Sequence, residues 1–344
     1  MRQRGRASSG FLVDVRIRSN PLEADSDRFA QEHGLHANRL PEEPEQLQDV
    51  VTPVMHQSAA FRVLRLCRDW TLEQHGSIAL EAFEEIRSEV VPQLDALGEG
   101  PTQLTLDPAL KPPAYWEGYE FHRSEGGWDG HDYMGFVHGE LIHRKMVGEH
   151  YAGLIFQQRK STAKIAPVDK PARILEMGCS SGHYTMGLIE AYPDSEIWAC
   201  DLSQRQLEQL QRAANERGVA LKLFQAAAEQ TGLEAQQFDL VTSYAMFHEL
   251  PSEAARRVLR ESLRLLKPGA CLLVGDVKAY HAQDNYERWK ADYWNQMHGG
   301  DPFWREYASA DLAQLALDEG FVEASWSGVE PDQYPFVLLA RKAA

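Results

Sequence analysis

Two acidic residues, each at the end of a predicted strand, stand where a nucleoside could be held. Glu176 lies in the apolar run 173–177, which is followed by a turn of small residues and then by a segment typical of a helix. Twenty-five residues further along, Asp201 ends the strand-like run 197–201. An acid at the end of the second strand of such a unit accepts hydrogen bonds from ribose hydroxyls. This spacing therefore predicts a cofactor that contains a nucleoside.

The turn after the first acid separates the classes of nucleoside cofactor. A dinucleotide site has the pattern G-x-G-x-x-G, because a pyrophosphate must approach bare backbone at a helix N-terminus. Here the pattern is Glu176-x-Gly178-x-Ser180-x-Gly182. An acid facing the loop repels a pyrophosphate and suits a cationic ligand. Serine is small enough for close approach, although a left-handed backbone at Ser180 would cost energy.

The run from Arg173 to Thr185 resembles motif I of the class I S-adenosylmethionine-dependent methyltransferases. The donor of that family carries a sulfonium and an ammonium group and no phosphate, which fits the acid before the turn. The resemblance continues in order through residues 172–342. It implies an α/β fold: a Rossmann-like, seven-stranded sheet with a closing antiparallel hairpin, preceded by a mainly helical N-terminal domain.

The same resemblance implies S-adenosylmethionine as the cofactor and indicates the residues that bind it. Asp201 and Leu202 match the ribose position, and Tyr244 is expected to pack around the methionine part. Ala227 stands where the family usually has an acid for the adenine, so Glu229 or the backbone of Ala227 and Ala228 would take that role. The full expected set is Glu176, Gly178, Ser180, Gly182, Asp201, Leu202, Ala227, Ala228, Glu229 and Tyr244.

Further runs match later parts of the family pattern. Residues 220–226 are predicted to form the third strand, 238–251 resemble motif IV, and 263–276 resemble the following helix end, turn and strand. The strand-like runs 321–329 and 334–342 fit the closing hairpin.

His248 is the candidate general base. It follows the fourth predicted strand, at the carboxyl edge where open α/β sheets place their sites. Its ordinary pKa of about 6.5 suits proton abstraction near neutrality. Glu249 is expected to orient His248 or to bind substrate, and Asp276 could face the substrate. The alternative is that His248 and Asp276 are only structural.

Composition limits the class of protein. The formal net charge of −16 disfavours nucleic acid, whose binding depends on cationic side chains. No run approaches the roughly 20 apolar residues of a membrane helix. The four cysteines show no C-x-x-C spacing, which favours a reduced, cytoplasmic protein. We therefore expect a small-molecule substrate and neither nucleic-acid nor membrane partners.

The first part of the chain is predicted to be helical. We divide the sequence into an N-terminal helical domain (1–112), a lid and entry helix rich in histidine and aromatic residues (113–160), and a methyltransferase domain (161–344). Helical periodicity begins near Glu45, and one helix face would hold Phe61, Leu64, Leu66 and Trp70. These helices are expected to form a homodimer interface or a wall of the substrate site, or only to pack.

The segment 115–143 has a high density of histidines and aromatic residues. In one interpretation it is a lid, and Trp128, His131, Tyr133 and His138 touch the substrate. In a second it packs an entry helix running from about Met134 to Lys160. In a third it binds a metal through His131 and Asp132 with His138 or His122, although the spacing matches no established ligand pattern.

The long connection 280–307 is expected to cover the acceptor. Most of its aromatic residues would form a local core, and we expect Trp289 and Asp276 to reach the substrate. So much aromatic surface favours an apolar or planar small molecule.

The sequence thus predicts methyl transfer to oxygen or carbon of a small, aromatic or polyketide-like metabolite of specialised metabolism. Alternatives are metal-assisted methyl transfer that uses the histidine-rich segment, a non-catalytic S-adenosylmethionine-binding protein, and a nicotinamide oxidoreductase.

Overall fold

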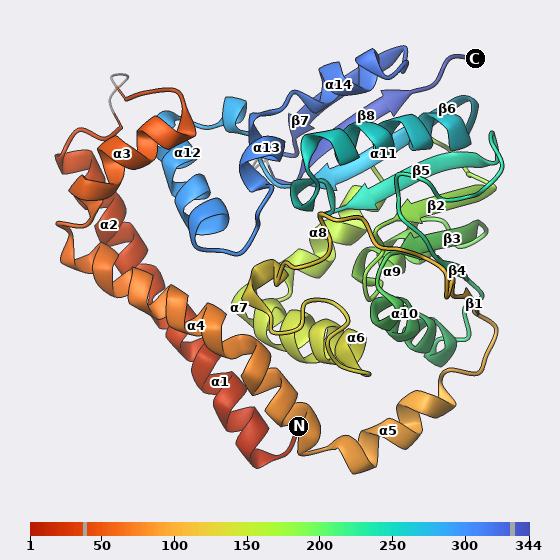
Figure 1. Cartoon of the computed structure of the whole chain (residues 1–344), viewed down its shortest axis with the longest axis horizontal. Helices are drawn as coiled ribbons and strands as arrows, with labels where there is room; N and C mark the ends of the chain where they lie inside the picture. The colour runs from red at the N-terminus through yellow and green to blue at the C-terminus, as the bar shows by residue number, and fades with distance from the viewer. Residues whose placement is uncertain (37–39, 331–333) are drawn as a thin grey trace.

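A mixed eight-stranded sheet organises the computed structural model, which describes residues 1–36, 40–330 and 334–344 (Figure 1). The spatial order is β1-β4-β3-β2-β5-β6-β8-β7. All neighbours up to β6 pair in parallel, whereas β8 is antiparallel to both β6 and β7. The strands are β1 (Gln103–Thr105), β2 (Arg173–Met177), β3 (Glu196–Asp201), β4 (Lys222–Gln225), β5 (Phe238–Tyr244), β6 (Leu266–Asp276), β7 (Glu323–Gly328) and β8 (Phe336–Arg341).

Helices cover both faces of this sheet, which explains why its central strands are apolar runs. Successive residues of β2 point to opposite sides. Ile174 packs in one core with Leu188 of α9, and Leu175 packs in the other with Val258 of α11. The helices of these layers are α8 (Leu154–Ala163), α9 (His183–Ala191), α10 (Gln204–Glu216), α11 (Ser252–Leu265) and α14 (Leu312–Asp318).

The sheet confirms the expected strands and adds one. The third strand and the closing hairpin lie where the sequence predicts them, as β4 and as β7 with β8. The additional strand, β1, comes from the boundary segment rich in glycine and proline and pairs with β4 at the edge. Seven strands are therefore those expected, and the eighth extends the sheet beyond them.

The N-terminal region is helical, as predicted, but its first two helices were not anticipated. Helices α1 and α4 run side by side (Figure 1). In α4, Phe61 and Leu64 are buried, whereas Leu66 is 69% exposed, so the prediction that Leu66 shares their face is wrong. Leu66 follows Leu64 by two positions, which is a rotation of about 200° around the helix axis, so the two side chains point to nearly opposite sides. The helices here are α1 (Gln3–Arg18), α2 (Asn20–Glu32), α3 (Pro44–Met55), α4 (Ala59–Glu84) and α5 (Arg87–Ala96).

The predicted helix from Met134 to Lys160 is wrong as a continuous element. Helical structure continues to His150, turns at Ala152 and Gly153, which have φ of 50° and 76°, and resumes in α8. The pieces are α6 (Met134–Phe136), the π-helix η2 (Val137–Val147) and α7 (Gly148–His150). A left-handed pair cannot continue a right-handed helix, which accounts for the break.

The remaining short helices lie around the carboxyl edge of the sheet. They are η1 (Phe121–Arg123), η3 (Phe247–Glu249), η4 (Tyr280–Ala282), α12 (Asn285–Asp292), η5 (Tyr293–Met297) and α13 (Trp304–Ser309). Helix α12 packs against α3, so residues from the predicted N-terminal and catalytic domains share one core. The division at residues 112 and 160 stays a prediction. Among the described helices, none is long and apolar enough to cross a membrane.

Candidate active site

The turn between β2 and α9 has the tight geometry that its sequence predicts. Gly178 and Gly182 have φ of 69° and 88°. A Cβ at Gly178 would collide with Met246, and one at Gly182 would collide with Leu210. Ser180 has φ of 46°, so the middle position is left-handed and the serine carries the backbone cost expected for it.

Asp201 closes this turn from the end of β3. Its Oδ2 accepts a hydrogen bond from the backbone N–H of Ser180 at 2.8 Å, and its Oδ1 accepts one from Ser203 at 2.9 Å. Burial raises the pKa of the carboxyl to about 6, although the two N–H groups favour the ionised form. The carboxylate also lines the cavity described below, where its remaining lone pairs can accept ribose hydroxyls.

Glu176 and Arg159 bring two unsatisfied polar atoms to the other side of the turn. Glu176 is 1% exposed, and neither its Oε2 nor Nη1 of Arg159 has a hydrogen-bond partner among the described residues. Burial raises the pKa of Glu176 to about 8; the charge of Asp201 adds to this, and Arg159 opposes it. One carboxyl and one guanidinium at the same small hollow suit the ammonium and carboxylate of an amino acid.

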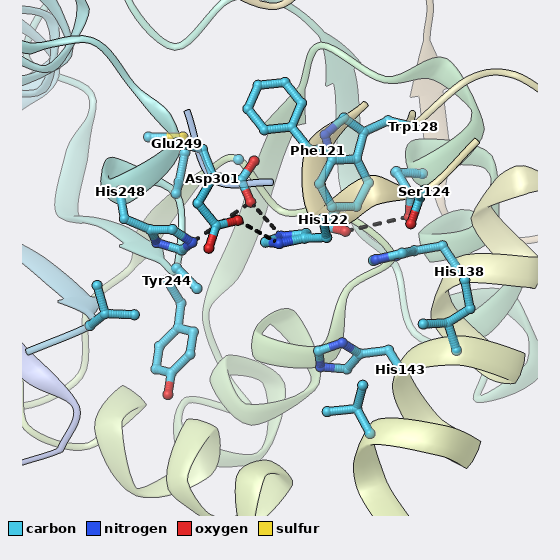
Figure 2. A pocket seen from close by; sticks show the side chains of 18 of the residues that line it. Phe121, His122, Ser124, Trp128, His138, His143, Tyr244, His248, Glu249 and Asp301 are labelled. Carbon is cyan, nitrogen blue, oxygen red and sulfur yellow. Dashed lines mark hydrogen bonds and ion pairs between the residues drawn. The ribbon is translucent and has the colours of Figure 1, made fainter. Parts of the chain in front are cut away.

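One cavity of about 550 Å³ joins this turn to a group of histidines and carboxylates (Figure 2). It extends from Gly178, Ser180 and Asp201 to His122, His248 and Glu249. Of the other expected cofactor residues, Leu202, Ala228, Glu229 and Tyr244 line it, and Glu176 lines the adjoining hollow. Gly182, the N-cap of α9, and Ala227 line neither space.

His248 is held by a carboxylate behind it. Its Nδ1 lies 2.6 Å from Oδ1 of Asp276, whose Oδ2 accepts the backbone N–H of Phe247 at 2.8 Å. Burial lowers the pKa of His248, but the charges of Asp276 and Glu249 outweigh burial and raise it to about 9. The ring is therefore protonated at neutral pH in this arrangement, unlike the free imidazole that the sequence suggests.

His122 lies between two carboxylates on the opposite wall. Its Nε2 is 2.9 Å from Oε1 of Glu249, and its Nδ1 is 2.7 Å from Oδ1 of Asp301. Burial opposes protonation, yet Asp301 and Glu249 raise the pKa of His122 well above its usual value. Figure 2 shows this ring facing both carboxylates.

Two of the expected substrate residues line the cavity. Trp128 and His138 meet edge to face, with ring centroids 4.5 Å apart. Burial lowers the pKa of His138 to about 3, so this imidazole is neutral. Both residues remain candidates for contact with an acceptor.

Four other residues expected at the substrate do not line this cavity, and their contact with a substrate stays a prediction. His131 lies 3.5 Å from Glu84, and the hydroxyl of Tyr133 donates to Asp95 at 2.8 Å. These contacts fix the entry segment to the N-terminal helices.

The other two are buried. Trp289 is fully buried in the core formed with α3 and α4, and Asp276 lies behind His248. Spacing alone could not show which face of α12 meets a neighbour and which meets the cavity.

Sequence reasoning missed Arg159 and Asp301 and placed His122 only in a different metal set. Arg159 follows the break in the entry helix, and Asp301 follows a pair of glycines in the long connection. Asp132, expected beside His131 as a metal ligand, instead pairs with Arg205. The missed residues meet only through contacts distant in sequence, for which no local pattern gives a signal.

The comparison with known families agrees with this geometry. The family model described as a methyltransferase domain matches residues 174–269, the part that carries the cofactor turn and Asp201. Residues 174–269 therefore form a methyltransferase domain, as the resemblance of the sequence motifs implies. The orphaned atoms of Glu176 and Arg159 fit the amino-acid portion of S-adenosylmethionine, the cofactor that the sequence motifs imply.

Curated relatives resemble only part of this chain. An uncharacterised protein of Haemophilus influenzae is 32% identical over 107 residues, covering 30% of this chain and 42% of the relative. The trans-aconitate 2-methyltransferase of Methylobacterium nodulans is 31% identical over 151 residues, covering 44% and 54%. The chain thus spans about half the length of these relatives.

Among solved structures, phosphoethanolamine N-methyltransferase 2 of Haemonchus contortus in complex with S-adenosyl-L-methionine has a TM-score of 0.43 and 16% identity. The match covers 55% of this chain and 53% of that one.

Proposed function

We propose that this chain transfers a methyl group from S-adenosylmethionine to an oxygen or carbon atom of a small metabolite. The observation that carries the proposal is the shared cavity, which reaches from the cofactor turn to the side chains of His122, His248 and Glu249. Donor and acceptor can therefore lie in one space, and alignment of two reactants can lower the barrier of such a reaction by up to about 7–11 kcal/mol.

Three side chains would hold the cofactor. Asp201 would accept the ribose hydroxyls, Glu176 would pair with the ammonium, and Arg159 would pair with the carboxylate. When bound, S-adenosylmethionine supplies an activated methyl group, because the sulfur–carbon bond breaks with its electron pair left on sulfur as the new bond to the acceptor forms.

The acceptor would lie toward the entry segment. Phe121 and Trp128 line that part of the cavity, and apolar side chains from α1 and η2, Leu12 and Ile142, extend it. Such walls favour a planar or apolar body with few polar groups. This is the support for an aromatic or polyketide-like acceptor.

The acceptor must also lose a proton. This would occur at the charged end of the cavity, which carries His122, His248 and Glu249. In the fraction of molecules whose His248 is deprotonated at Nε2, a minority near neutrality because its pKa is raised to about 9, the imidazole would accept the proton and Asp276 would maintain its orientation. With a metal at the same nitrogen, the acceptor oxygen would become more acidic through coordination. Nε2 of His248 cannot accept a proton and bind a metal at the same time, and a metal titration distinguishes the two roles.

A methyl-transfer assay tests the proposal. Purified protein is incubated with S-adenosylmethionine carrying a labelled methyl group and a panel of phenols, β-keto acids and carboxylic acids. We expect labelled product and S-adenosylhomocysteine from at least one class, and neither with Asp201→Ala at the same cofactor concentration. Cofactor binding without transfer to any acceptor would favour the non-catalytic alternative instead.

A further inference from the structure

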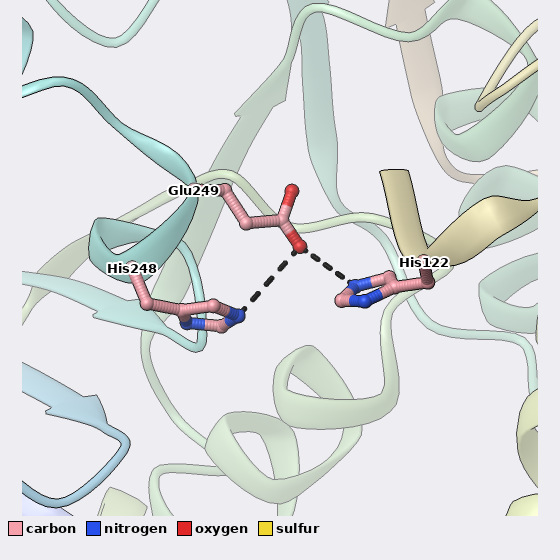
Figure 3. Close-up of side chains that lie close together, drawn as sticks. All are labelled: His122, His248 and Glu249. Carbon is pink, nitrogen blue, oxygen red and sulfur yellow. Dashed lines mark hydrogen bonds and ion pairs between the residues drawn. The ribbon is translucent and has the colours of Figure 1, made fainter. Parts of the chain in front are cut away.

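Three donor atoms from two distant parts of the chain converge at the charged end of the cavity (Figure 3). Oε1 of Glu249 lies 2.9 Å from Nε2 of His122 and 3.8 Å from Nε2 of His248, and all three ligand atoms lie within 4.8 Å of one another. Donors bound at about 2.1 Å to one ion are separated by roughly 3–3.5 Å. The two separations from Glu249 bracket this range, and the two Nε2 atoms lie no more than 4.8 Å apart, so side-chain movements that close these gaps would complete a site.

The surroundings of both imidazoles match those of metal ligands. Each ring turns its Nδ1 toward a buried carboxylate: His122 toward Asp301 at 2.7 Å, and His248 toward Asp276 at 2.6 Å. A ligating histidine usually donates its second ring N–H to such a carboxylate, which fixes the ring and leaves the other nitrogen for the ion. In both rings the nitrogen left over is Nε2, and both Nε2 atoms face Glu249.

The backbone at His122 is held in a costly conformation. Its φ is 54° and its ψ is 25°, a left-handed conformation that residues other than glycine adopt at a cost in energy. The backbone N–H of His122 donates to the carbonyl of Gly300 at 3.1 Å, which ties it to the segment carrying Asp301. The side chain keeps 38% of its surface accessible, so an ion could reach the ring.

The charge at this end of the cavity also favours a cation. Glu249, Asp276 and Asp301 contribute three carboxylates around two imidazoles, with side-chain exposures of 16%, 1% and 7%. Buried carboxylates need compensating positive charge. Protonated imidazoles supply it in the ion-free protein, and one divalent ion between two neutral imidazoles would supply the same two positive charges in the middle of the group.

We infer that His122, His248 and Glu249 bind one divalent transition-metal ion such as Fe²⁺, Mn²⁺ or Zn²⁺, with Asp276 and Asp301 as positioning residues. Two imidazoles and one carboxylate are the donor set of non-haem iron and of some catalytic zinc sites, which keep open positions for a substrate oxygen. This set shares only His122 with the one expected from the sequence, which was His131 and Asp132 with His138 or His122. The role of the ion in polarising a carbonyl or carboxylate of the acceptor rests on the proposed methyl transfer, whereas the site itself does not.

A metal titration tests the inference on the full chain. Protein stripped with a chelator is titrated with Mn²⁺, and electron paramagnetic resonance measures the loss of the free-ion signal. We expect one equivalent to bind and Zn²⁺ to displace it. His122→Ala and Glu249→Gln should each weaken Mn²⁺ binding at least about 10-fold. The control is His131→Ala, which alters a histidine of the same segment outside the site and should bind Mn²⁺ as the unaltered protein does.

Circular dichroism confirms that each variant is folded. If His122→Ala is not, Asp276→Asn and Asp301→Asn carry the test, with an expected weakening of about 10- to 100-fold. Failure of the unaltered protein to bind either Mn²⁺ or Zn²⁺, or equal binding by the ligand variants, would overturn the site. A parallel S-adenosylmethionine titration and methyl-transfer assay separate the two proposals. Bound metal without transfer contradicts only the proposed function, and transfer by metal-free protein contradicts only the role of the ion in the reaction.

Discussion

His248 and Asp276 are joined at the carboxyl edge of the sheet, with Nδ1 of the imidazole 2.6 Å from Oδ1 of the carboxylate and both side chains almost closed to solvent. One follows β5 and the other ends β6, and these strands are neighbours. The sheet itself therefore sets their separation. Whether Nε2 of the ring holds a proton or a metal, this contact determines which nitrogen faces the cavity.

Asp276→Asn should reduce turnover while leaving cofactor binding intact. The amide keeps the shape of the carboxylate but cannot accept the Nδ1 proton with the same strength. We expect kcat to fall about 10- to 100-fold, with the dissociation constant for S-adenosylmethionine changed by less than about 3-fold. Steady-state kinetics and calorimetry measure the two quantities, and Asp132→Asn, an exposed carboxylate outside the site, is the control. Equal kcat values for both variants would make the contact only structural.

Binding of S-adenosylmethionine should release a proton from Glu176. With a pKa of about 8 the carboxyl is about nine-tenths protonated at pH 7, and pairing with an ammonium group favours its ionised form. Calorimetry at pH 7 in two buffers of different ionisation enthalpy should show up to about 0.9 proton released, and Glu176→Gln should release none.

The raised pKa of Glu176 also makes the free energy of unfolding depend on pH. In the free protein the folded state keeps a proton that the unfolded state loses above the ordinary pKa of 4.5, so this group lowers the free energy of unfolding as pH rises from 4.5 to about 8. Glu176→Gln should flatten that part of the stability profile. An unchanged profile would show that Glu176 is not protonated when the site is empty of cofactor.

Arg159→Met should weaken the binding of S-adenosylmethionine through loss of one contact, that with the carboxylate of the cofactor. Losing a charge-assisted hydrogen bond costs about 1.5–3 kcal/mol, or about 10- to 150-fold in the dissociation constant. The matched ligand is S-adenosylmethionine that lacks its carboxylate, which should bind the variant and the unaltered protein alike. If the variant loses affinity equally for both ligands, Arg159 acts on the packing of the site and not on the carboxylate.

Ser180→Gly should be tolerated and modestly stabilising. Serine occupies a left-handed position with φ of 46°, and glycine removes a cost of about 1 kcal/mol there. Urea unfolding should give a free energy of unfolding higher by up to about that amount, and cofactor affinity should stay within about 3-fold. A large loss of affinity would instead assign the serine hydroxyl a direct contact with the cofactor.

The cofactor half of the site could be predicted from sequence because its determinants are local. A strand, a turn of small residues and a helix are contiguous, and Asp201 follows at the next strand end. The structure places Gly178, Ser180 and Asp201 around one cavity as that pattern requires.

The acceptor half could not be predicted in the same way. His122 and Asp301 are far apart in the chain and meet through the packing of η1 against the connection after η5. Trp289 was expected at the substrate because its segment is rich in aromatic residues, yet α12 places it in a core with α3 and α4. Aromatic density predicts burial well, but it does not tell which partner buries the residue.

Calorimetric titration of S-adenosylmethionine into the full chain and into Asp201→Ala tests the central claim most directly. We predict one binding site in the unaltered protein and an affinity about 10- to 150-fold lower in the variant, because charge-assisted hydrogen bonds to the ribose are lost. Equal affinity in the two proteins would contradict the ribose assignment, and absence of binding to a folded unaltered protein would contradict the account as a whole.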